Sequence, residues 1–313
     1  MKVYDSFPFH LAKRDRAIAL GFFDGVHLGH QKLIQELLEV SRKCDLCPAV
    51  FTFDSHPASL LDSNFKFSGL IQTVDLRLEK LADLEVAETV LAPMIEAVSH
   101  ISAKDFYRHY LCEQFSMRAM VVGDDAHFGY KGQGDADLLT LWTKRDGLDF
   151  IRVSDVMVDG EKVSSTRIRL LLEKGRVREA NRCLGYPFQV KGRVVTGKKL
   201  GRTLGFPTIN LAYDDRLVQL LYGVYASRVL VGGQAYPAIS SIGTNPTVDE
   251  SQTVKLETYI YDKSMDLYDE IVRVEFLDFI RPEIHFPSVE AMTERILSDL
   301  KFVEDCHKRG QYR

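Results

Sequence analysis

The sequence lacks the features that mark membrane, secreted and nucleic-acid-binding proteins. No apolar run reaches the roughly 18 residues of a membrane-spanning helix, and the first residues hold no apolar core of a secretory leader. Lysine and arginine number 40 against 44 aspartates and glutamates, a net charge of −4, so no broad basic surface is implied. We therefore expect a cytoplasmic protein that binds neither membranes nor nucleic acid.

Cysteine is also scarce, and its pattern gives no sign of disulfides or of a metal centre. The five cysteines are an odd number spread along the chain, as in proteins of a reducing compartment. Cys44 and Cys47 form a CxxC pair, but no second pair and no nearby histidine completes a site. With 313 residues, 45% of them hydrophobic, the chain is long enough for two domains with separate cores.

The first stretch that predicts a functional site consists of a strand, a turn and a helix. Residues 16–21 form an apolar run that predicts a buried strand, and Asp24 and Gly25 turn the chain. From about Leu28 the apolar residues recur at helical spacing. This order is typical of a mononucleotide-binding unit, because free N–H groups at a helix start attract phosphate.

Two histidines stand at the start of this helix. His27 and His30 are three residues apart, so both imidazoles can reach one phosphate, and Gly29 between them lets a ligand approach the backbone. A random HxxH pair more often consists of surface histidines. A zinc site would need more ligands, and no glutamate lies between the two histidines as in metalloproteases. The glycines and the strand-turn-helix context favour nucleotide binding.

The string HLGH resembles the HxGH signature of the nucleotidylyltransferases. The longer string GFFDGVHLGHQ, residues 21–31, is similar to the opening of the bacterial bifunctional riboflavin kinase/FAD synthetases, although Phe22 stands where asparagine is commoner. The resemblance implies that His27 and His30 are catalytic. It also implies that ATP is bound at Gly21, Phe23, Asp24, Gly25 and Gly29.

Strand and helix patterns alternate up to residue 186. Helices are predicted over 73–84, 102–115 and 135–147, between strand patterns at 47–54, 85–94, 118–125 and 148–156. Within the strand pattern at 118–125, residues 119–123 are apolar without a break, so we expect this strand inside a parallel sheet. The alternation predicts an open, doubly wound sheet with ligands beyond the carboxyl ends of its strands.

A glycine-rich polar loop, residues 123–135, follows the predicted inner strand. A plain connection is the alternative interpretation. The loop resembles a segment of the same family that frames the flavin phosphate, although Ala126 replaces the usual aromatic residue. The resemblance implies flavin binding by Asp125, His127 and Phe128.

Residues 164–175, SSTRIRLLLEKG, predict a helix that begins with hydroxyl residues and carries Arg167 and Arg169. A guanidinium can hold two phosphate oxygens, but a capped helix with solvated arginines would look the same. The stretch resembles the family's SSTxxR motif. This implies ATP binding by Ser165 and Thr166, and a catalytic Arg169 that meets the β- and γ-phosphates.

The predicted secondary structure changes near residue 186. A helix ends at Gly185, and short strand-like runs follow at 188–195, 222–231, 234–243, 255–262 and 271–280. They predict an antiparallel barrel, and residues 288–306 predict a closing helix capped by Ser288. We therefore expect two domains, residues 1–185 and 186–313.

The second half contains a basic, glycine-rich stretch at 197–210, GKKLGRTLGFPTIN. It can wrap a polyphosphate without being a Walker A loop, but an ordinary basic hairpin loop is as good an interpretation. The stretch resembles the riboflavin kinase signature. The resemblance implies that Thr208 and Asn210 hold Mg²⁺, and that ATP phosphates are bound by Gly197, Lys198, Gly201, Arg202 and Gly205.

Glu257 lies in the middle of a predicted strand. Such an acid is usually solvated, but a kinase needs a carboxylate to take a proton from the substrate hydroxyl. In the family that this chain resembles, the general base occupies this position. The resemblance also implies that Asn245 and Arg281 line the flavin end of the site.

The resemblance runs from about residue 15 to residue 300, with its motifs in the family's order. It implies an α/β chain: a Rossmann-like nucleotidylyltransferase domain, then a six-stranded antiparallel β-barrel riboflavin kinase domain with a closing helix. The implied reactions are phosphorylation of riboflavin to FMN and adenylylation of FMN to FAD with release of pyrophosphate, with ATP as co-substrate and Mg²⁺ as cofactor. The alternatives are an enzyme with only one of these activities and a non-catalytic flavin sensor. No pattern indicates an oligomeric state.

Overall fold

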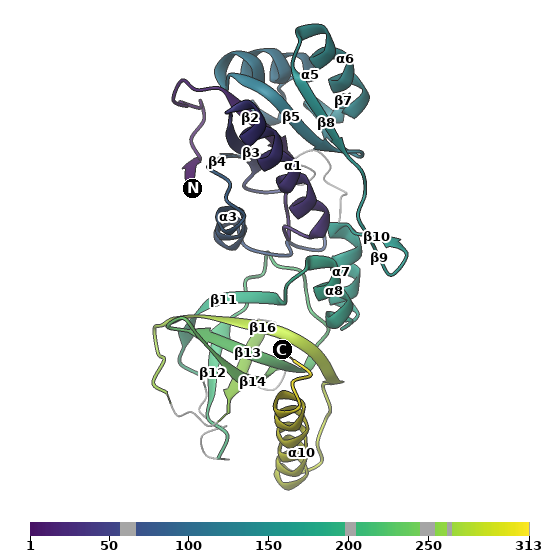
Figure 1. The fold of residues 1–313 in the computed structure, drawn as a ribbon. Coiled ribbons are helices and arrows are strands. Elements are labelled where there is room, and N and C mark those ends of the chain that lie inside the picture. The colour runs from purple at the N-terminus through teal and green to yellow at the C-terminus, as the bar shows by residue number, and fades with distance from the viewer. Residues whose placement is uncertain (57–66, 198–204, 245–253, 262–264, 313) are drawn as a thin grey trace. The chain divides into compact units, whose positions relative to one another are not determined.

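The computed structural model describes residues 1–56, 67–197, 205–244, 254–261 and 265–312. The chain forms two compact units (Figure 1). The first comprises Met1–Phe67 and Thr73–Ser164, and the second comprises Ser68–Gln72 and Ser165–Arg313.

The first unit is built on a six-stranded sheet in which every neighbouring pair is parallel. The order across the sheet is β1-β4-β3-β2-β5-β8. This confirms the predicted parallel sheet, with strand β5 in its interior. The edge strand β1 is too short to show a pattern and was not predicted. The strands are β1 (Lys2–Tyr4), β2 (Arg16–Leu20), β3 (Cys47–Phe53), β4 (Glu88–Ala92), β5 (Met117–Gly123) and β8 (Asp149–Val153).

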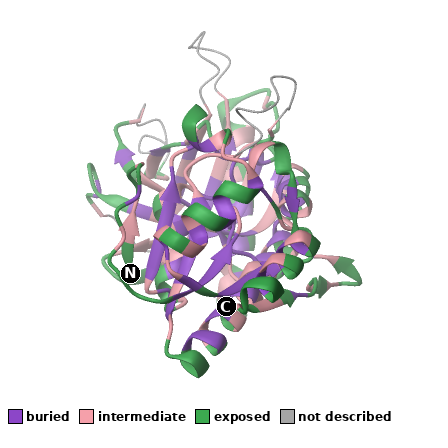
Figure 2. Cartoon of the chain, turned by 90° about the horizontal axis from the view of Figure 1, so that it is seen from above, coloured by how far each residue is buried: buried purple, intermediate pink, exposed green. Residues whose placement is uncertain are grey.

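Helices cover both faces of this sheet, which confirms the doubly wound arrangement (Figure 1). Ala17 and Ala19 of β2 pack in one core with helices α1 and α3, whereas Ile18 and Leu20 pack in the other. The strands are mostly buried, and the outward helix faces are exposed (Figure 2). The helices are α1 (Leu28–Cys44), α3 (Val74–Asp83), α4 (Glu96–Ser99), α5 (Ala103–Asp105) and α6 (Ala136–Asp146).

The predicted helix over 102–115 has an unexpected form. Ser102 caps the short helix α5, but residues Phe106–Gln114 then form a π-helix. Its hydrogen bonds join residues five apart, so that Phe106 and Leu111 lie on the same buried face. Tyr107 is also buried, whereas Tyr110 is only half-buried.

The order of the strands locates the switch point of the sheet. The chain leaves β2, builds β3 and β4 on one side of it, and then returns to place β5 on the other. Ligands of open α/β sheets bind outside the carboxyl ends of the strands at such a point. Residues 21–26 follow β2 and residues 124–126 follow β5, so both predicted motifs lie at this edge. Two small antiparallel pairs complete the unit: β6 (His127–Phe128) with β7 (Gly134–Asp135), and β9 (Met157–Val158) with β10 (Glu161–Lys162).

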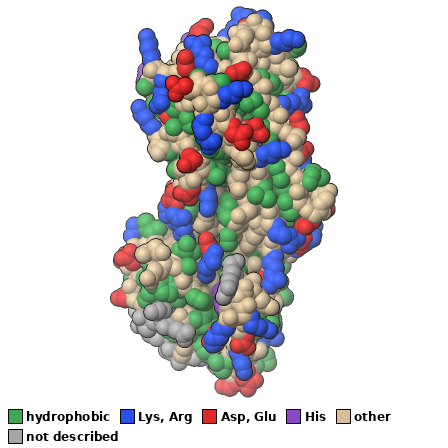
Figure 3. All heavy atoms as spheres, viewed as in Figure 1, with side chains coloured by type: hydrophobic (Ala, Val, Ile, Leu, Met, Phe, Trp, Pro, Cys, Tyr) green, Lys and Arg blue, Asp and Glu red, His purple; other side chains and the backbone are tan. Residues whose placement is uncertain are grey.

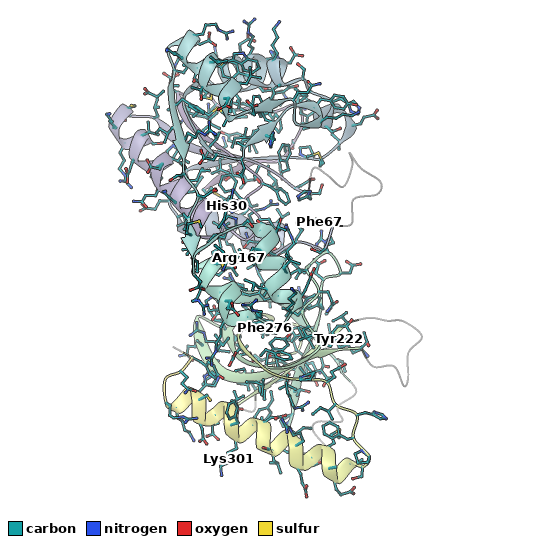
Figure 4. The ribbon with its side chains drawn as sticks, turned by 90° about the vertical axis from the view of Figure 1, so that its right-hand side faces the viewer. His30, Phe67, Arg167, Tyr222, Phe276 and Lys301 are labelled. Atoms are coloured by element: carbon teal, nitrogen blue, oxygen red, sulfur yellow. The ribbon has the colours of Figure 1, made fainter. Side chains whose placement is uncertain are left out.

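The second unit contains a closed antiparallel barrel of six strands, in the order β11-β12-β15-β14-β13-β16. This confirms the predicted barrel. Phe276 lies fully buried among its strands (Figure 4), edge-on to the ring of Tyr225. The strands are β11 (Phe188–Val195), β12 (Thr208–Ala212), β13 (Gly223–Val231), β14 (Gln234–Gly243), β15 (Lys255–Ile260) and β16 (Ile271–Pro282).

Helix α10 (Val289–Lys308) closes the second unit, as predicted, with the Ser288 side chain capping its first turn. Leu300 and Val303 of α10 pack in one core with Ala226 and Leu277 of the barrel. Helices α7 (Ser165–Glu173) and α8 (Val177–Leu184) also belong to this unit, and the side-chain amide of Asn181 donates to the carbonyl of Phe276 at 2.8 Å. The boundary between residues 185 and 186 remains a prediction about domains.

Two further expectations can be compared with the structure. In the part of the chain that the structure covers, no helix is long and apolar enough to cross a membrane. The five cysteines are free thiols. On the face shown in Figure 3, basic and acidic side chains are interspersed.

Candidate active sites

The turn between β2 and α1 has a strained backbone. Phe23 and Val26 have φ angles of 54° and 31°, in the left-handed region, and Gly25 has a φ of 80°. A non-glycine residue held there costs about 1–3 kcal/mol and persists only where neighbours enforce it. Gln31 Nε2 donates to the carbonyl of Val26 at 2.9 Å, and Thr52 Oγ1 donates to that of Phe22 at 2.8 Å. The turn is therefore held at both ends.

His27 is the N-cap of α1. Its Nδ1 atom accepts a hydrogen bond from the backbone N–H of His30 at 3.3 Å. A ring nitrogen that accepts carries no proton, so the neutral imidazole of His27 has its hydrogen on Nε2. The ring stacks on that of His30, with 3.7 Å between centroids and 13° between planes. The structure thus brings the two predicted histidines together.

His30 lies in the first turn of α1 (Figure 4) and is held neutral. Burial lowers its pKa well below 6.5, and the proximity of His27 and Arg77 lowers it further. Its Nδ1 atom is buried and finds no hydrogen-bond partner in the described structure. An unsatisfied buried ring nitrogen is costly, so it is a candidate ligand-binding atom.

Gly29 has a second role besides the predicted one. A β-carbon at this position would lie 3.2 Å from Cε1 and Nδ1 of His27. This is closer than carbon atoms normally pack, so a side chain would push the His27 ring away from its capping position. The approach of a ligand to the Gly29 backbone remains a prediction, as do the ATP contacts of Gly21, Phe23, Asp24 and Gly25.

Arg77 of α3 was missed by the sequence analysis. It is 1% exposed, and its Nη1 atom donates to the carbonyl of Phe22 at 2.7 Å. Its guanidinium lies 4.9 Å from the centre of the Phe22 ring. The signal in the sequence was a basic residue between Leu76 and Leu81, inside the helix predicted over 73–84.

The loop after β5 contains a network of ion pairs. Lys162 bridges Asp125 and Asp155, each at 2.8 Å, and Arg152 contacts Asp124 at 2.5 Å and Asp137 at 2.6 Å. Partial burial would raise the pKa of Asp125, but the hydrogen bond and charge of Lys162 outweigh it and lower the pKa. Asp125 is therefore ionised at neutral pH.

Two of the residues predicted to bind flavin in this loop lie in different environments. Phe128 is buried against Phe106 and Trp142, with ring centres 6.0 and 6.1 Å away, whereas His127 is exposed. A methyl group at Gly134 would overlap the Phe128 ring, and one at Gly129 would lie 2.5 Å from the backbone of Ala103. Part of the loop's glycine content thus serves packing. Flavin binding by Asp125, His127 and Phe128 remains a prediction.

Ser165, Thr166 and Arg169 lie in helix α7 of the second unit. Arg169 is buried, and its Nε atom donates to the carbonyl of Gly69 at 2.7 Å. The backbone of Gly69 lies so close to Leu217 that a side chain would overlap it. Contact of Arg169 with ATP phosphates, and of Ser165 and Thr166 with ATP, remains a prediction.

The barrel aligns several of its predicted residues in one row across neighbouring strands, the Glu257 row. Asn210 of β12 is directly opposite Glu257 of β15, which is in turn opposite Ser241 of β14. Thr208 lies two residues before Asn210, on the same face of the strand. These four side chains are half-buried, whereas Leu256 and Thr258, which alternate with Glu257, are buried inside the barrel. Ser241 was not predicted, because only the strand register reveals it.

Gly197 lies against this row. A methyl group at Gly197 would overlap the side-chain amide of Asn210, so a larger residue there would displace that amide. Gly205 has a φ of 86°, which also favours glycine. The predicted residues Lys198, Gly201, Arg202 and Asn245 lie outside the described residues.

Arg281 lies beneath helix α10. Its Nε atom contacts Asp299 at 2.6 Å, and both side chains are buried. Arg295 holds the other oxygen of Asp299 at 3.0 Å. Arg281 thus joins β16 to α10, and its predicted flavin contact remains untested.

The donor atoms near Glu257 suit a hard cation. Thr208 offers a hydroxyl and Asn210 an amide oxygen, and Mg²⁺ prefers oxygen ligands while keeping several waters or phosphate oxygens. Within the described ranges, no group of three or more His, Cys, Asp or Glu side chains could hold a metal.

The first unit has a parallel sheet with a histidine pair at its switch point, and the second has a barrel with the Glu257 row. These features define a class of two-domain phosphoryl- and nucleotidyl-transferases. The family model described as FAD synthetase matches residues 10–167, and the one described as riboflavin kinase matches residues 184–307. The chain belongs to the bifunctional riboflavin kinase/FMN adenylyltransferase family.

Similar proteins support this assignment over most of the chain. Members named bifunctional riboflavin kinase/FMN adenylyltransferase are 34% identical in Listeria monocytogenes, over 91% of this chain and 90% of that protein, and 34% identical in Escherichia coli K12, over 90% of each. The Bacillus subtilis protein of that name is 32% identical over 95% of each chain. A crystal structure titled macrolide-efflux protein from Streptococcus pneumoniae is 32% identical, covers 94% of each chain and superposes with a TM-score of 0.83.

Proposed function

We propose that this protein makes FAD in two ATP-dependent steps, phosphorylating riboflavin to FMN and then transferring an adenylyl group to FMN. The observation that carries the proposal is that one chain holds two separate sets of reactive groups. The first unit holds the His27–His30 pair, and the second holds the Asn210–Glu257 pair. Both halves also match their family models. A single-activity enzyme would need only one set.

In the kinase step, Glu257 takes the proton of the 5′-hydroxyl of riboflavin. The hydroxyl oxygen forms a bond to the γ-phosphorus of ATP in line with the leaving oxygen, and ADP departs. Thr208 and Asn210 would hold Mg²⁺, which neutralises phosphate charge when bound. Gly197 and Gly205, with the predicted Lys198, Gly201 and Arg202, surround the phosphates. Arg281 and Asn245 are the predicted contacts at the flavin end.

In the adenylyl step, a phosphate oxygen of FMN forms a bond to the α-phosphorus of ATP, and pyrophosphate leaves. The nucleophile is already anionic, so the step needs no strong base. Catalysis rests on positioning and on stabilising charge. His27 presents Nε2–H as a donor, and the start of α1 adds backbone N–H groups. Arg169 is the predicted contact of the departing pyrophosphate.

The experiment is incubation of the purified protein with riboflavin, ATP and Mg²⁺, followed by chromatography of the flavins. FAD appearing after FMN supports both activities, whereas FMN alone leaves only the kinase. If no product forms, FMN is supplied directly: FAD then indicates a lone adenylyltransferase, and binding without turnover indicates a flavin sensor. Chelation of Mg²⁺ should stop both reactions. A cytoplasmic location remains a prediction that the free thiols support.

A further inference from the structure

Arg77 belongs to none of the motifs that point to the two reactions. It lies on the buried side of α3, between Leu76 and Leu81, where an apolar residue would pack without cost. Arginine is almost never fully buried unless it is paired, because removing the charge from water is expensive. Its presence there needs a reason other than packing.

Arg77 contacts one residue in two ways. Its Nη1 donates to the backbone carbonyl of Phe22, and its guanidinium faces the Phe22 ring. The same carbonyl accepts from Thr52 Oγ1. Phe22 is therefore held both at its backbone and at its side chain.

The pairing of Arg77 is incomplete. Its Nε and Nη2 atoms are buried and lack partners in the resolved parts of the chain. Burial lowers the pKa of Arg77 to about 10, although the charges of Asp24 and Asp54 oppose the shift. The side chain thus remains a cation at neutral pH, at a cost in stability.

Phe22 immediately precedes the strained part of the turn. Phe23 follows with a positive φ, the turn ends at Val26, and His27 then caps α1. Strained residues keep their conformation only where the surroundings enforce it. The contacts of Arg77 hold the start of the turn, so a shift of Phe22 would be passed on to His27 and His30.

We propose that Arg77 is a positioning residue for adenylyl transfer, which fixes Phe22 by its carbonyl and its ring and thereby fixes the turn that presents His27 and His30. This proposal rests on the proposed adenylylation of FMN.

The test uses the full chain with Arg77→Met, Arg77→Lys and Thr52→Val, and measures FAD formation from FMN. Arg77→Met should lower kcat by about 10- to 100-fold, as expected for a misplaced catalytic group, with KM for ATP changed less than about threefold. Arg77→Lys, which keeps the cation, should recover part of the loss. Thr52→Val removes one of the two donors to Phe22 and should have a smaller effect. FMN formation from riboflavin is the internal control and should not change.

A double-mutant cycle tests the pair itself. If Phe22 and Arg77 act as one unit, Phe22→Leu combined with Arg77→Met should lower kcat no further than Arg77→Met alone. If the fold-losses in kcat of the two single variants multiply in the double variant, the two residues act independently and the proposed pairing is wrong.

Hydrogen exchange gives a readout that needs no turnover. Arg77→Met should speed amide exchange in peptides covering residues 20–30, with peptides from β13 unchanged as the control. If the wild-type protein makes no FAD from FMN, the proposed function fails while exchange still decides on the positioning role. Wild-type kcat and exchange in Arg77→Met, or reduced thermal stability with unchanged kcat, would overturn the proposal.

Discussion

The two candidate sites are built in opposite ways. In the first unit, His27 and His30 lie within one turn of one helix, and a strained turn held by distant side chains orients them. In the second, Asn210, Glu257 and Ser241 come from three strands and meet only through the register of a closed barrel. A local motif thus forms the histidine site, whereas strand pairing forms the Glu257 row. The following substitutions should separate the two sites.

The largest expected effect is that of Glu257→Gln. It removes the proposed proton acceptor while keeping the shape of the side chain, so FMN formation should fall by about 10²- to 10⁴-fold. FAD formation from supplied FMN should stay at the wild-type rate. Glu270→Gln, at an exposed acid outside the row, is the matched control. Equal loss of both activities in Glu257→Gln would argue against separate sites.

His30→Asn should have the converse effect. Loss of a stabilising group in the adenylyl site should lower FAD formation from FMN by about 10²- to 10³-fold, with riboflavin phosphorylation unchanged. The rates are measured by chromatography of the flavins. His109→Asn changes an exposed histidine of the same unit and should behave as wild type. A kinase defect in His30→Asn would contradict the comparison.

Gly197→Ala tests the packing of Gly197 against the Glu257 row. The added methyl group overlaps the amide of Asn210, so the proposed Mg²⁺ ligand is displaced. We expect riboflavin phosphorylation to fall by about 10-fold and to need more Mg²⁺, because small misplacements are costly in catalysis. A Mg²⁺ titration of the initial rate checks this. Unchanged rates at limiting Mg²⁺ would remove Asn210 from the metal site.

The smallest effect concerns pH. Because burial, followed by the charges of His27 and Arg77, lowers the pKa of His30 below 6.5 in the folded protein, the unfolded chain takes up a proton first as the pH falls. Folding stability should therefore decrease below pH 6.5, by at most about 1.4 kcal/mol per pH unit from this group. Denaturant unfolding of the wild type and of His30→Asn should show a shallower decrease in the variant. Parallel curves would mean that the pKa of His30 is not lowered in the folded protein.

The alternation of patterns predicted both folds correctly, because most of the strands and helices have a clear periodicity. The parallel sheet, the barrel and the closing helix follow from apolar spacing, and the cap residue Ser288 was identified from residue type alone. The edge strand β1 and the π-helix escaped prediction. Strand β1 has only three residues, which are too few to show a period. A π-helix differs from an α-helix in that its hydrogen bonds join residues five apart and not four, and this difference leaves the spacing of the apolar residues almost unaltered.

By itself, the sequence determined the histidine pair, the turn before it and the chemical groups of the barrel site, since these depend on residue type and short spacing. Only the tertiary structure decided which distant residues join them: Arg77 and Thr52 on Phe22, Ser241 beside Glu257, and Asp299 on Arg281. Burial and strand register set these contacts. Both arise from packing between elements that are far apart in the chain, and no local pattern records them.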